Sequence, residues 1–218
     1  MLKPSTRRLS TMYKNVAHVK NCLAAFVMLL PLLGGGCTTA QGTKTPVNAV
    51  EPAANVAALH QQAVALMQQE KWQEAVQLYE NITAQQDNLS GTWLNLGIAY
   101  IKTGNSGSAE AALKKSIDTN SANIEAYNQL GILYRRTGRL EEAAFIYEIA
   151  LKAAPENTNI HWNLGILHDK YLPDAGKALF HYQRYQQLTG SNNAHLQVWV
   201  NKLENSTRAN SLAAKVAP

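Results

Sequence analysis

Apolar residues recur three and four positions apart over most of the chain, from about residue 56 to residue 204. This spacing places them on one side of an α-helix, so it predicts a series of amphipathic helices. The segments 93–100, 127–134 and 161–168 read WLNLGIAY, YNQLGILY and HWNLGILH, and their starts follow one another at a constant interval. Each is followed by a second helical pattern rich in alanine. The chain is therefore predicted to be an all-α protein made of repeated helix pairs.

The residues at fixed places in these segments resemble the tetratricopeptide repeat (TPR). One repeat has an acceptable residue at all eight positions that mark this family: Tyr127, Leu130, Gly131, Tyr134, Ala143, Tyr147, Ala150 and Pro155. The preceding repeat departs at Ser116 and Ser121, and the outer repeats match at fewer positions, as terminal repeats often do. The resemblance implies a right-handed solenoid of about four helix–turn–helix repeats. Their expected ranges are 56–89, 90–123, 124–157 and 158–192.

Small residues at two places in each repeat let its two helices approach closely. They are Gly97, Gly131 and Gly165 on the first helices and Ala109, Ala143 and Ala178 on the second. Since each helix has one apolar stripe, the repeats must stack to bury it. Residues 193–204 read as a further amphipathic helix that caps the open end, with Leu196, Trp199, Val200 and Leu203 on one side. Residues 205–218 are small and polar, and we expect a disordered tail.

The N-terminal segment has the pattern of an export signal. A basic stretch free of acids precedes eleven apolar residues, Leu23–Leu33, too few for a membrane-spanning helix. Gly34, Gly35, Gly36 and Cys37 follow, and they resemble the lipobox of bacterial lipoproteins, although Gly34 stands where leucine is usual. The resemblance implies a signal peptide over 1–36, acylation of Cys37, and an outer-membrane protein that faces the periplasm. The alternative is a plain secreted, periplasmic protein with Cys37 present by chance.

Composition narrows the function classes. Residues 1–36 hold five of the 20 basic residues and none of the 15 acidic ones, so the rest has no net formal charge. A nucleic-acid-binding protein needs a basic surplus on its folded part, so we exclude that class. Two cysteines exclude a disulfide-stapled fold. Residues 37–54 are polar and contain prolines, which predicts a flexible tether, with a docked N-terminal arm as the alternative.

In the TPR family, the first helices line a groove that holds partner segments. The places that contact ligands carry Leu94, Ile98, Ile101, Asn128, Ile132, Arg135, Trp162, Ile166 and Asp169, with Arg136 and Lys170 at the edge. Ile98, Ile132 and Ile166 recur once in each repeat at the same place and would form an apolar ladder. We therefore expect an extended or helical partner segment with apolar anchors, and not a clamp for a terminal carboxylate. The alternative is that the isoleucines are packed core and the groove binds nothing.

No motif for catalysis, a metal or a cofactor emerges from the sequence. A metal site could be suggested by His161, His168, His181 and Asp169. The first two, however, occupy positions of the repeat that pack in the core. Nucleophile motifs and phosphate loops are missing from the sequence. We expect no enzyme, no metal and no cofactor.

The sequence thus predicts a protein-binding scaffold lipoprotein of the Gram-negative cell envelope. Assembly of a pilus or secretion complex ranks slightly ahead of two other roles, an adaptor for peptidoglycan enzymes and an accessory of an energy-transducing transport complex. A self-associating structural module, that is a homo-oligomer, is the alternative from another class.

Overall fold

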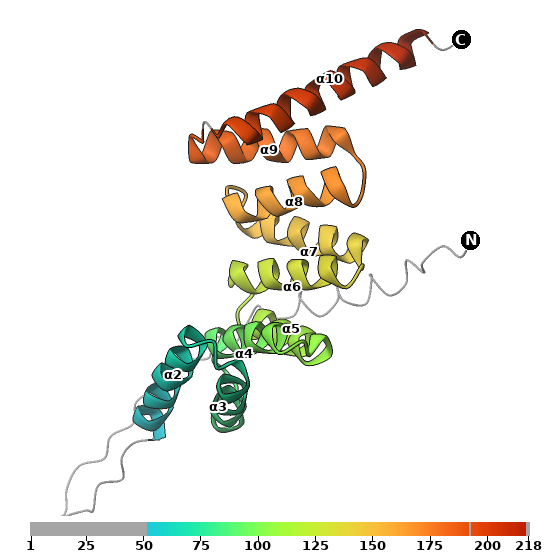
Figure 1. The fold of residues 1–218 in the computed structure, drawn as a ribbon. Coiled ribbons are helices and arrows are strands. Elements are labelled where there is room, and N and C mark those ends of the chain that lie inside the picture. Colours follow the sequence, from blue (N-terminus) through green and yellow to red (C-terminus); the bar gives the residue numbers. More distant parts are fainter. Residues whose placement is uncertain (1–51, 192, 217–218) are drawn as a thin grey trace, which may run out of the picture. The chain divides into compact units, whose positions relative to one another are not determined.

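The computed structural model describes residues 52–191 and 193–216, and in them the helices follow one another in antiparallel pairs (Figure 1). The pairs are α2 (Pro52–Gln68) with α3 (Trp72–Gln85), α4 (Ser90–Lys102) with α5 (Ser106–Thr119), α6 (Ile124–Arg136) with α7 (Leu140–Ala153), and α8 (Thr158–Lys170) with α9 (Ala175–Thr189). A last helix, α10 (Ala194–Val216), packs on α9. Because the described residues form helices and no strands, the predicted all-α repeat fold is confirmed.

Asparagine and aspartate side chains begin four of these helices. Asn105, Asn123, Asn157 and Asp174 precede α5, α6, α8 and α9, and each side chain accepts a hydrogen bond from a backbone N–H in the first turn. Such caps satisfy donors that have no partner inside the helix. Between the helices of the two central pairs, Gly104 and Gly138 adopt positive φ values of 82° and 76°. The short turns therefore follow from residue type.

The small residues of each pair set the distance between its two helices. A Cβ on Gly131 would lie 2.5 Å from the Cζ atom of Tyr147, and one on Gly165 would lie 2.5 Å from the Cε1 atom of Tyr182. Carbon atoms in ordinary contact are about 3.5–4.0 Å apart. Both tyrosines are fully buried. Glycine at these places is therefore required by the close packing of the helices.

The core extends along the stack of helix pairs in three clusters. One cluster of buried residues joins α2 to α5, a second joins α5 to α8, and a third joins α9 to α10. Tyr100 packs against both of the first two clusters, so it joins neighbouring repeats. Each pair buries its apolar stripes against the next, as a solenoid must.

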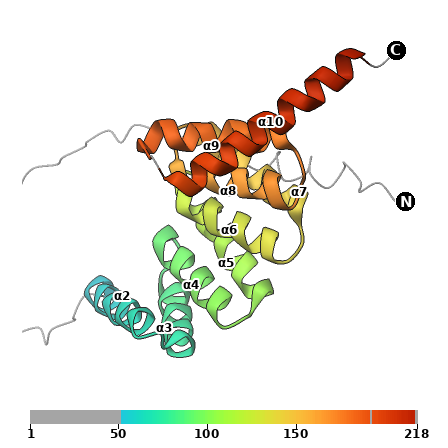
Figure 2. The same ribbon diagram turned by 45° about the horizontal axis from the view of Figure 1, so that its top comes forward.

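The end of the chain differs from the sequence prediction. Residues 205–218 are expected to be disordered, but α10 continues as a helix to Val216. Leu196, Val200 and Leu203 near its start are buried against α9, which fixes the first turns of the helix. In both views the second half of α10 projects beyond α9 (Figures 1 and 2). Once started, a helix lengthens easily through residues that have no strong breaker, and 205–216 contain neither glycine nor proline.

Most of the predictions for the N-terminal segment concern residues that the structure does not describe. The signal peptide over 1–36 and Cys37 lie outside the described residues, as does the tether up to residue 51. The helix α2 begins at Pro52, inside the range expected for the tether, and proline is favoured in the first turn of a helix. Over residues 52–191 and 193–216, no helix has both the length and the apolar character needed to cross a membrane.

Candidate protein-binding groove

The first helices of the repeats form a common surface. The helix α6 contacts both α4 and α8, its counterparts in the neighbouring pairs. The second helices make no comparable contacts with one another, so the first helices lie on the inner side of the stack. We call the surface of α4, α6 and α8 the inner face. The residues predicted to contact a partner belong to these three helices.

Two of the three predicted isoleucines keep an exposed part on the inner face. Ile98 and Ile132 are half-buried, and neither is among the side chains packed against the core clusters. Ile166 is half-buried too, but it packs against the cluster that joins α9 and α10. Ile98 and Ile132 of the predicted ladder are therefore partly accessible, whereas Ile166 contributes to the C-terminal core.

Other predicted groove residues take part in packing. Leu94 and Ile101 lie against the central core cluster. Asn128 is buried, and its Oδ1 accepts a hydrogen bond of 2.7 Å from Nδ2 of Asn163 on the next repeat. This bond between α6 and α8 crosses the floor of the inner face. A buried amide pair of this kind fixes how the two repeats meet, since an unpaired amide there would be costly.

The capping helix closes the inner face at its C-terminal end. The rings of Trp162 on α8 and Trp199 on α10 are stacked with centroids 6.3 Å apart, and the Tyr185 ring lies 5.0 Å from that of Trp162. The Lys170 ammonium lies over the Trp199 ring at 5.7 Å, and it also pairs with Asp169 at 2.8 Å. Trp162, Asp169 and Lys170 are thus engaged within the protein. The accessible part of the predicted groove lies on α4 and α6.

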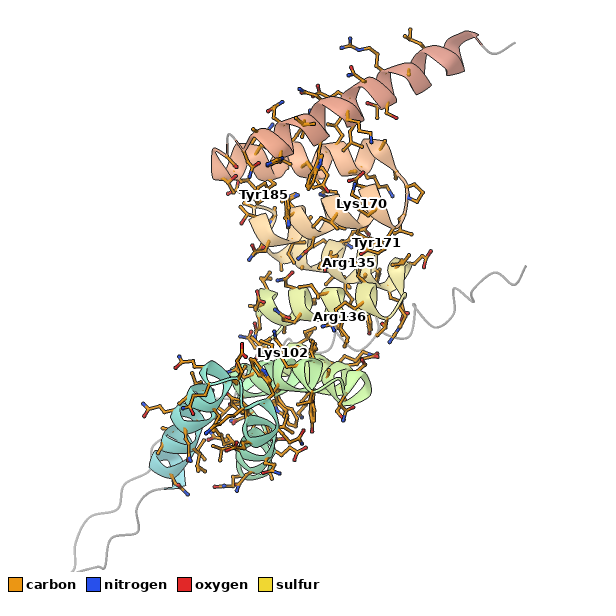
Figure 3. The ribbon with its side chains drawn as sticks, in the orientation of Figure 1. Lys102, Arg135, Arg136, Lys170, Tyr171 and Tyr185 are labelled. Carbon is orange, nitrogen blue, oxygen red and sulfur yellow. The ribbon has the colours of Figure 1, made fainter. Side chains whose placement is uncertain are left out.

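Basic side chains line one end of the inner-face helices (Figure 3). Lys102, Arg136 and Lys170 are the last residues of α4, α6 and α8, so each stands at the same place in its repeat. Arg135 lies next to Arg136, and its guanidinium is 5.5 Å from the centre of the exposed Tyr171 ring. The groove prediction includes three of these cations but omits Lys102. Its repeat position, which is the same as that of Arg136, is the signal that could have found it.

Among the described residues, Arg135 has donors that lack a close hydrogen-bond partner. Its Nε atom is buried without a hydrogen-bond partner, and Nη1 makes only a long bond of 3.4 Å to the Tyr171 hydroxyl. Neither Arg135 nor Arg136 forms an ion pair within the described residues. A guanidinium binds a carboxylate through two parallel hydrogen bonds. This end of α6 can therefore accept an acidic group beside the apolar Ile132.

The histidines of the last repeat lie in its interior. His161 and His168 are buried, and Nδ1 of His161 is 3.0 Å from Nδ1 of His181. Burial first, and then the positive charges of His161, His168 and Lys177, lower the pKa of His181 to about 4. Across residues 52–191 and 193–216 no three side chains are grouped as metal ligands. These histidines fill the space between α8 and α9.

The fold and the inner face define a helical repeat protein with a surface for other proteins. The family model described as tetratricopeptide repeat matches residues 60–124, 94–158 and 128–192. Because these matches cover more than half of the chain, the protein belongs to the tetratricopeptide repeat family. Repeats of this family mediate binding between proteins.

Relatives with curated names match less than half of this chain. The chain is 29% identical over 96 residues to tetratricopeptide repeat protein 8 of Homo sapiens, which covers 44% of this chain and 17% of that protein. The match to the Mus musculus protein is 29% over 98 residues, with 45% and 18% covered. The chain thus spans less than a fifth of the length of these relatives.

Solved structures show the same fold. The crystal structure of MamA has a TM-score of 0.60 at 18% identity, and the match covers 70% of this chain and 88% of MamA. YrrB, described as a TPR protein with an unusual peptide-binding site, has a TM-score of 0.57 at 18% identity, with 69% and 76% covered. The first TPR of Spaghetti (RPAP3), bound to an HSP90 peptide, has a TM-score of 0.51 at 22% identity, with 55% and 94% covered. At these identities the likeness concerns the fold.

Proposed function

We propose that this protein is a non-enzymatic adaptor that holds a segment of a partner protein on the inner face of α4 and α6. The segment carries apolar side chains that reach Ile98 and Ile132, and an acidic side chain that reaches Arg135 and Arg136. The observation that carries this proposal is the pairing of half-buried isoleucines with guanidinium groups that lack an ion pair among the described residues.

Two further facts support protein binding over chemistry. Proteins of the tetratricopeptide repeat family are in general scaffolds without catalytic activity, and RPAP3 is seen with a bound peptide. At the C-terminal end of the inner face, Lys170 is paired with Asp169 and lies over the Trp199 ring. Binding by such a face combines apolar anchors with charge complementarity at the edge.

The test is a pull-down from envelope extract with the full chain in mild detergent. Wild type is compared with the double variant Ile132→Asp/Arg135→Glu, which places two negative charges on the proposed contact. Lys152→Glu, an exposed charge reversal on α7, is the matched control. Circular dichroism verifies that all three proteins keep their helices.

We expect wild type and Lys152→Glu to retain the same proteins, and the double variant to lose them. Retention should fall as salt rises, because the edge contacts are ionic. If the folded double variant retains the same proteins as wild type, the inner face is not the binding surface. Retention of the chain itself, with oligomers in light scattering, would instead favour self-association.

Location is part of the proposal. The lipobox-like sequence up to Cys37 supports a lipid anchor on the periplasmic side of an outer membrane, and residues 38–51 would then give the repeats reach. Mass spectrometry of the mature protein tests this, because acylation adds the mass of fatty chains to a peptide that begins at Cys37. Cys37→Ser should abolish that modification. An unmodified mature N-terminus would indicate a secreted protein.

The cellular process in which this adaptor acts is to be determined from the identity of its partner. An adaptor in pilus or secretion-complex assembly is our first choice, ahead of roles with peptidoglycan enzymes or an energy-transducing transport complex. Identification of the proteins retained by wild type and lost by the inner-face variant decides among these three.

A further inference from the structure

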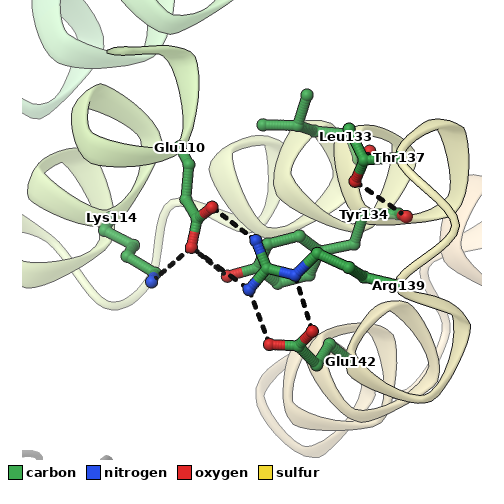
Figure 4. A network of polar contacts seen from close by, with 7 residues as sticks. All are labelled: Glu110, Lys114, Leu133, Tyr134, Thr137, Arg139 and Glu142. Carbon is green, nitrogen blue, oxygen red and sulfur yellow. Dashed lines mark hydrogen bonds and ion pairs between the residues drawn. The ribbon is translucent and has the colours of Figure 1, made fainter. Parts of the chain in front are cut away.

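A polar bridge closes the joint between the second and third repeats. The Arg139 guanidinium lies 4.0 Å from the centre of the Tyr134 ring and binds Glu142 through two hydrogen bonds of 2.6 Å (Figure 4). It also reaches Glu110 on α5 at 2.5 Å, and the Tyr134 hydroxyl donates to the same carboxylate at 2.9 Å. One arginine side chain thus fills the space between α5, α6 and α7.

The corresponding joint between the first and second repeats has other residues. Tyr100 stands one full repeat before Tyr134, and its hydroxyl donates a hydrogen bond to Glu80 on α3. Asn105 stands where Arg139 does, and its side chain accepts from the backbone N–H of Ser108. This joint therefore keeps the aromatic ring and a carboxylate but supplies no cation from the position of Arg139.

A cleft of about 550 Å³ lies at this joint. Its apolar lining is Ala84, Trp93, Leu96, Tyr100, Ala111 and Ala112, and its polar lining is Glu80, Thr83, Ser108 and Lys115. Lys115 directs its ammonium to Asp87 at 3.5 Å, so the charge of Glu80 is left to act on the cleft. Glu80 forms no ion pair among the described residues. The cleft thus joins apolar walls, an aromatic ring, one carboxylate, and the Lys115 side chain, whose charge is paired with Asp87.

We propose that this cleft is a second binding site, which takes an arginine side chain of a partner protein. The aliphatic part of arginine would lie along the alanines and Trp93, and its guanidinium would lie over Tyr100 and bind Glu80. The Arg139 bridge shows that a joint of this fold accommodates this arrangement. Arginine fits better than lysine because its planar group both stacks on a ring and binds a carboxylate in two places. The site is independent of the inner face.

The test is a titration of the ¹⁵N-labelled full chain with the capped peptide Ac-Ala-Arg-Ala-NH₂, followed by NMR. Peptides with citrulline or lysine in place of arginine measure the need for charge and shape. Glu80→Gln removes the carboxylate charge at nearly constant size. Glu74→Gln, an exposed change on the same helix outside the cleft, is its matched control. Asn105→Arg/Ser108→Glu rebuilds the residues of the third repeat and fills the cleft from within.

We expect saturable shifts at the Trp93 indole and at the amides near Tyr100 and Ser108, with a Kd on the order of 1 mM for so small a ligand. Glu80→Gln should weaken binding about tenfold, because one charge-assisted contact is lost. Glu74→Gln should leave binding unchanged, because Glu74 lies outside the cleft. The rebuilt joint should bind no peptide. Equal binding of the citrulline peptide, or unchanged binding by folded Glu80→Gln, would overturn the proposal. These binding experiments do not involve Ile132 or Arg135, so their outcome does not decide the inner-face proposal, which the pull-down tests separately.

Discussion

The close approach between paired helices gives the sharpest test of the packing argument. Gly131→Ala places a Cβ 2.5 Å from Cζ of Tyr147, about 1 Å inside normal contact. The Tyr147 ring is fully buried, so it has no free space into which it can turn. Overpacking of this kind costs about 3 kcal/mol, and the higher helix propensity of alanine returns about 1 kcal/mol. We expect the free energy of unfolding to fall by about 2 kcal/mol.

The matched control is Gly107→Ala on α5, where a Cβ meets nothing within 4 Å. Without a clash, only the gain in propensity remains, and we expect about 0.5 kcal/mol of added stability. Urea unfolding of the full chain, followed by circular dichroism, measures both changes. The reasoning is refuted if Gly131→Ala is as stable as wild type, or if the two variants shift the unfolding midpoint in the same direction.

Three other predictions concern the joints and the cap. Burial alone would raise the pKa of Glu110, but hydrogen bonds led by that from Arg139 lower it to about 2. Glu110→Gln should therefore lower the free energy of unfolding by about 2 kcal/mol at pH 7. The variant should also lack the part of the stability loss that wild type shows as the pH falls from 4.5 to about 2, measured by urea unfolding at a series of pH values. Burial and the neighbouring positive groups lower the pKa of His181 to about 4. The free energy of unfolding of wild type should then fall by about 1–2 kcal/mol between pH 7 and pH 5, since the unfolded chain takes up the proton first. A His181→Gln variant that loses as much stability as wild type over this pH range would contradict the reasoning. Val200→Asp should detach α10 at a cost of about 3 kcal/mol and shift the tryptophan emission to the red as Trp162 becomes exposed, whereas unchanged emission would mean that the cap stays in place.

The repeat pattern predicts the fold because each of its signals is local. Gly131, Tyr134 and Ala143 recur at distances fixed by helix geometry, so their packing follows from their spacing. The sequence prediction ends α10 too early because the apolar stripe weakens after Leu203, and helix continuation there depends on the absence of breakers.

The candidate site is predicted less well, since it depends on contacts between repeats. Spacing selects Trp162 and Ile166, but only the position of α10 shows that these residues are partly covered. Spacing also selects Asn128, and only the structure shows that its Oδ1 atom accepts a hydrogen bond from Asn163 of the next repeat. The cleft at Tyr100 is lined by residues of three helices from two repeats, so it cannot be found from the spacing within one repeat.

The Arg139 bridge also bears on how the chain avoids misassembly. The repeats have similar apolar surfaces, so a folding chain could stack α5 against the wrong neighbour and still bury most of its carbon. Only the third repeat supplies an arginine at the place that meets Glu110, because the second repeat has Asn105 there and the fourth has Asp174 as the equivalent helix cap. Pairing with the second or the fourth repeat would leave the Glu110 carboxylate facing an amide or another acid, whereas the first repeat has Lys71 at this place. The bidentate pair with arginine therefore favours the third repeat over the second and the fourth as the neighbour of α5.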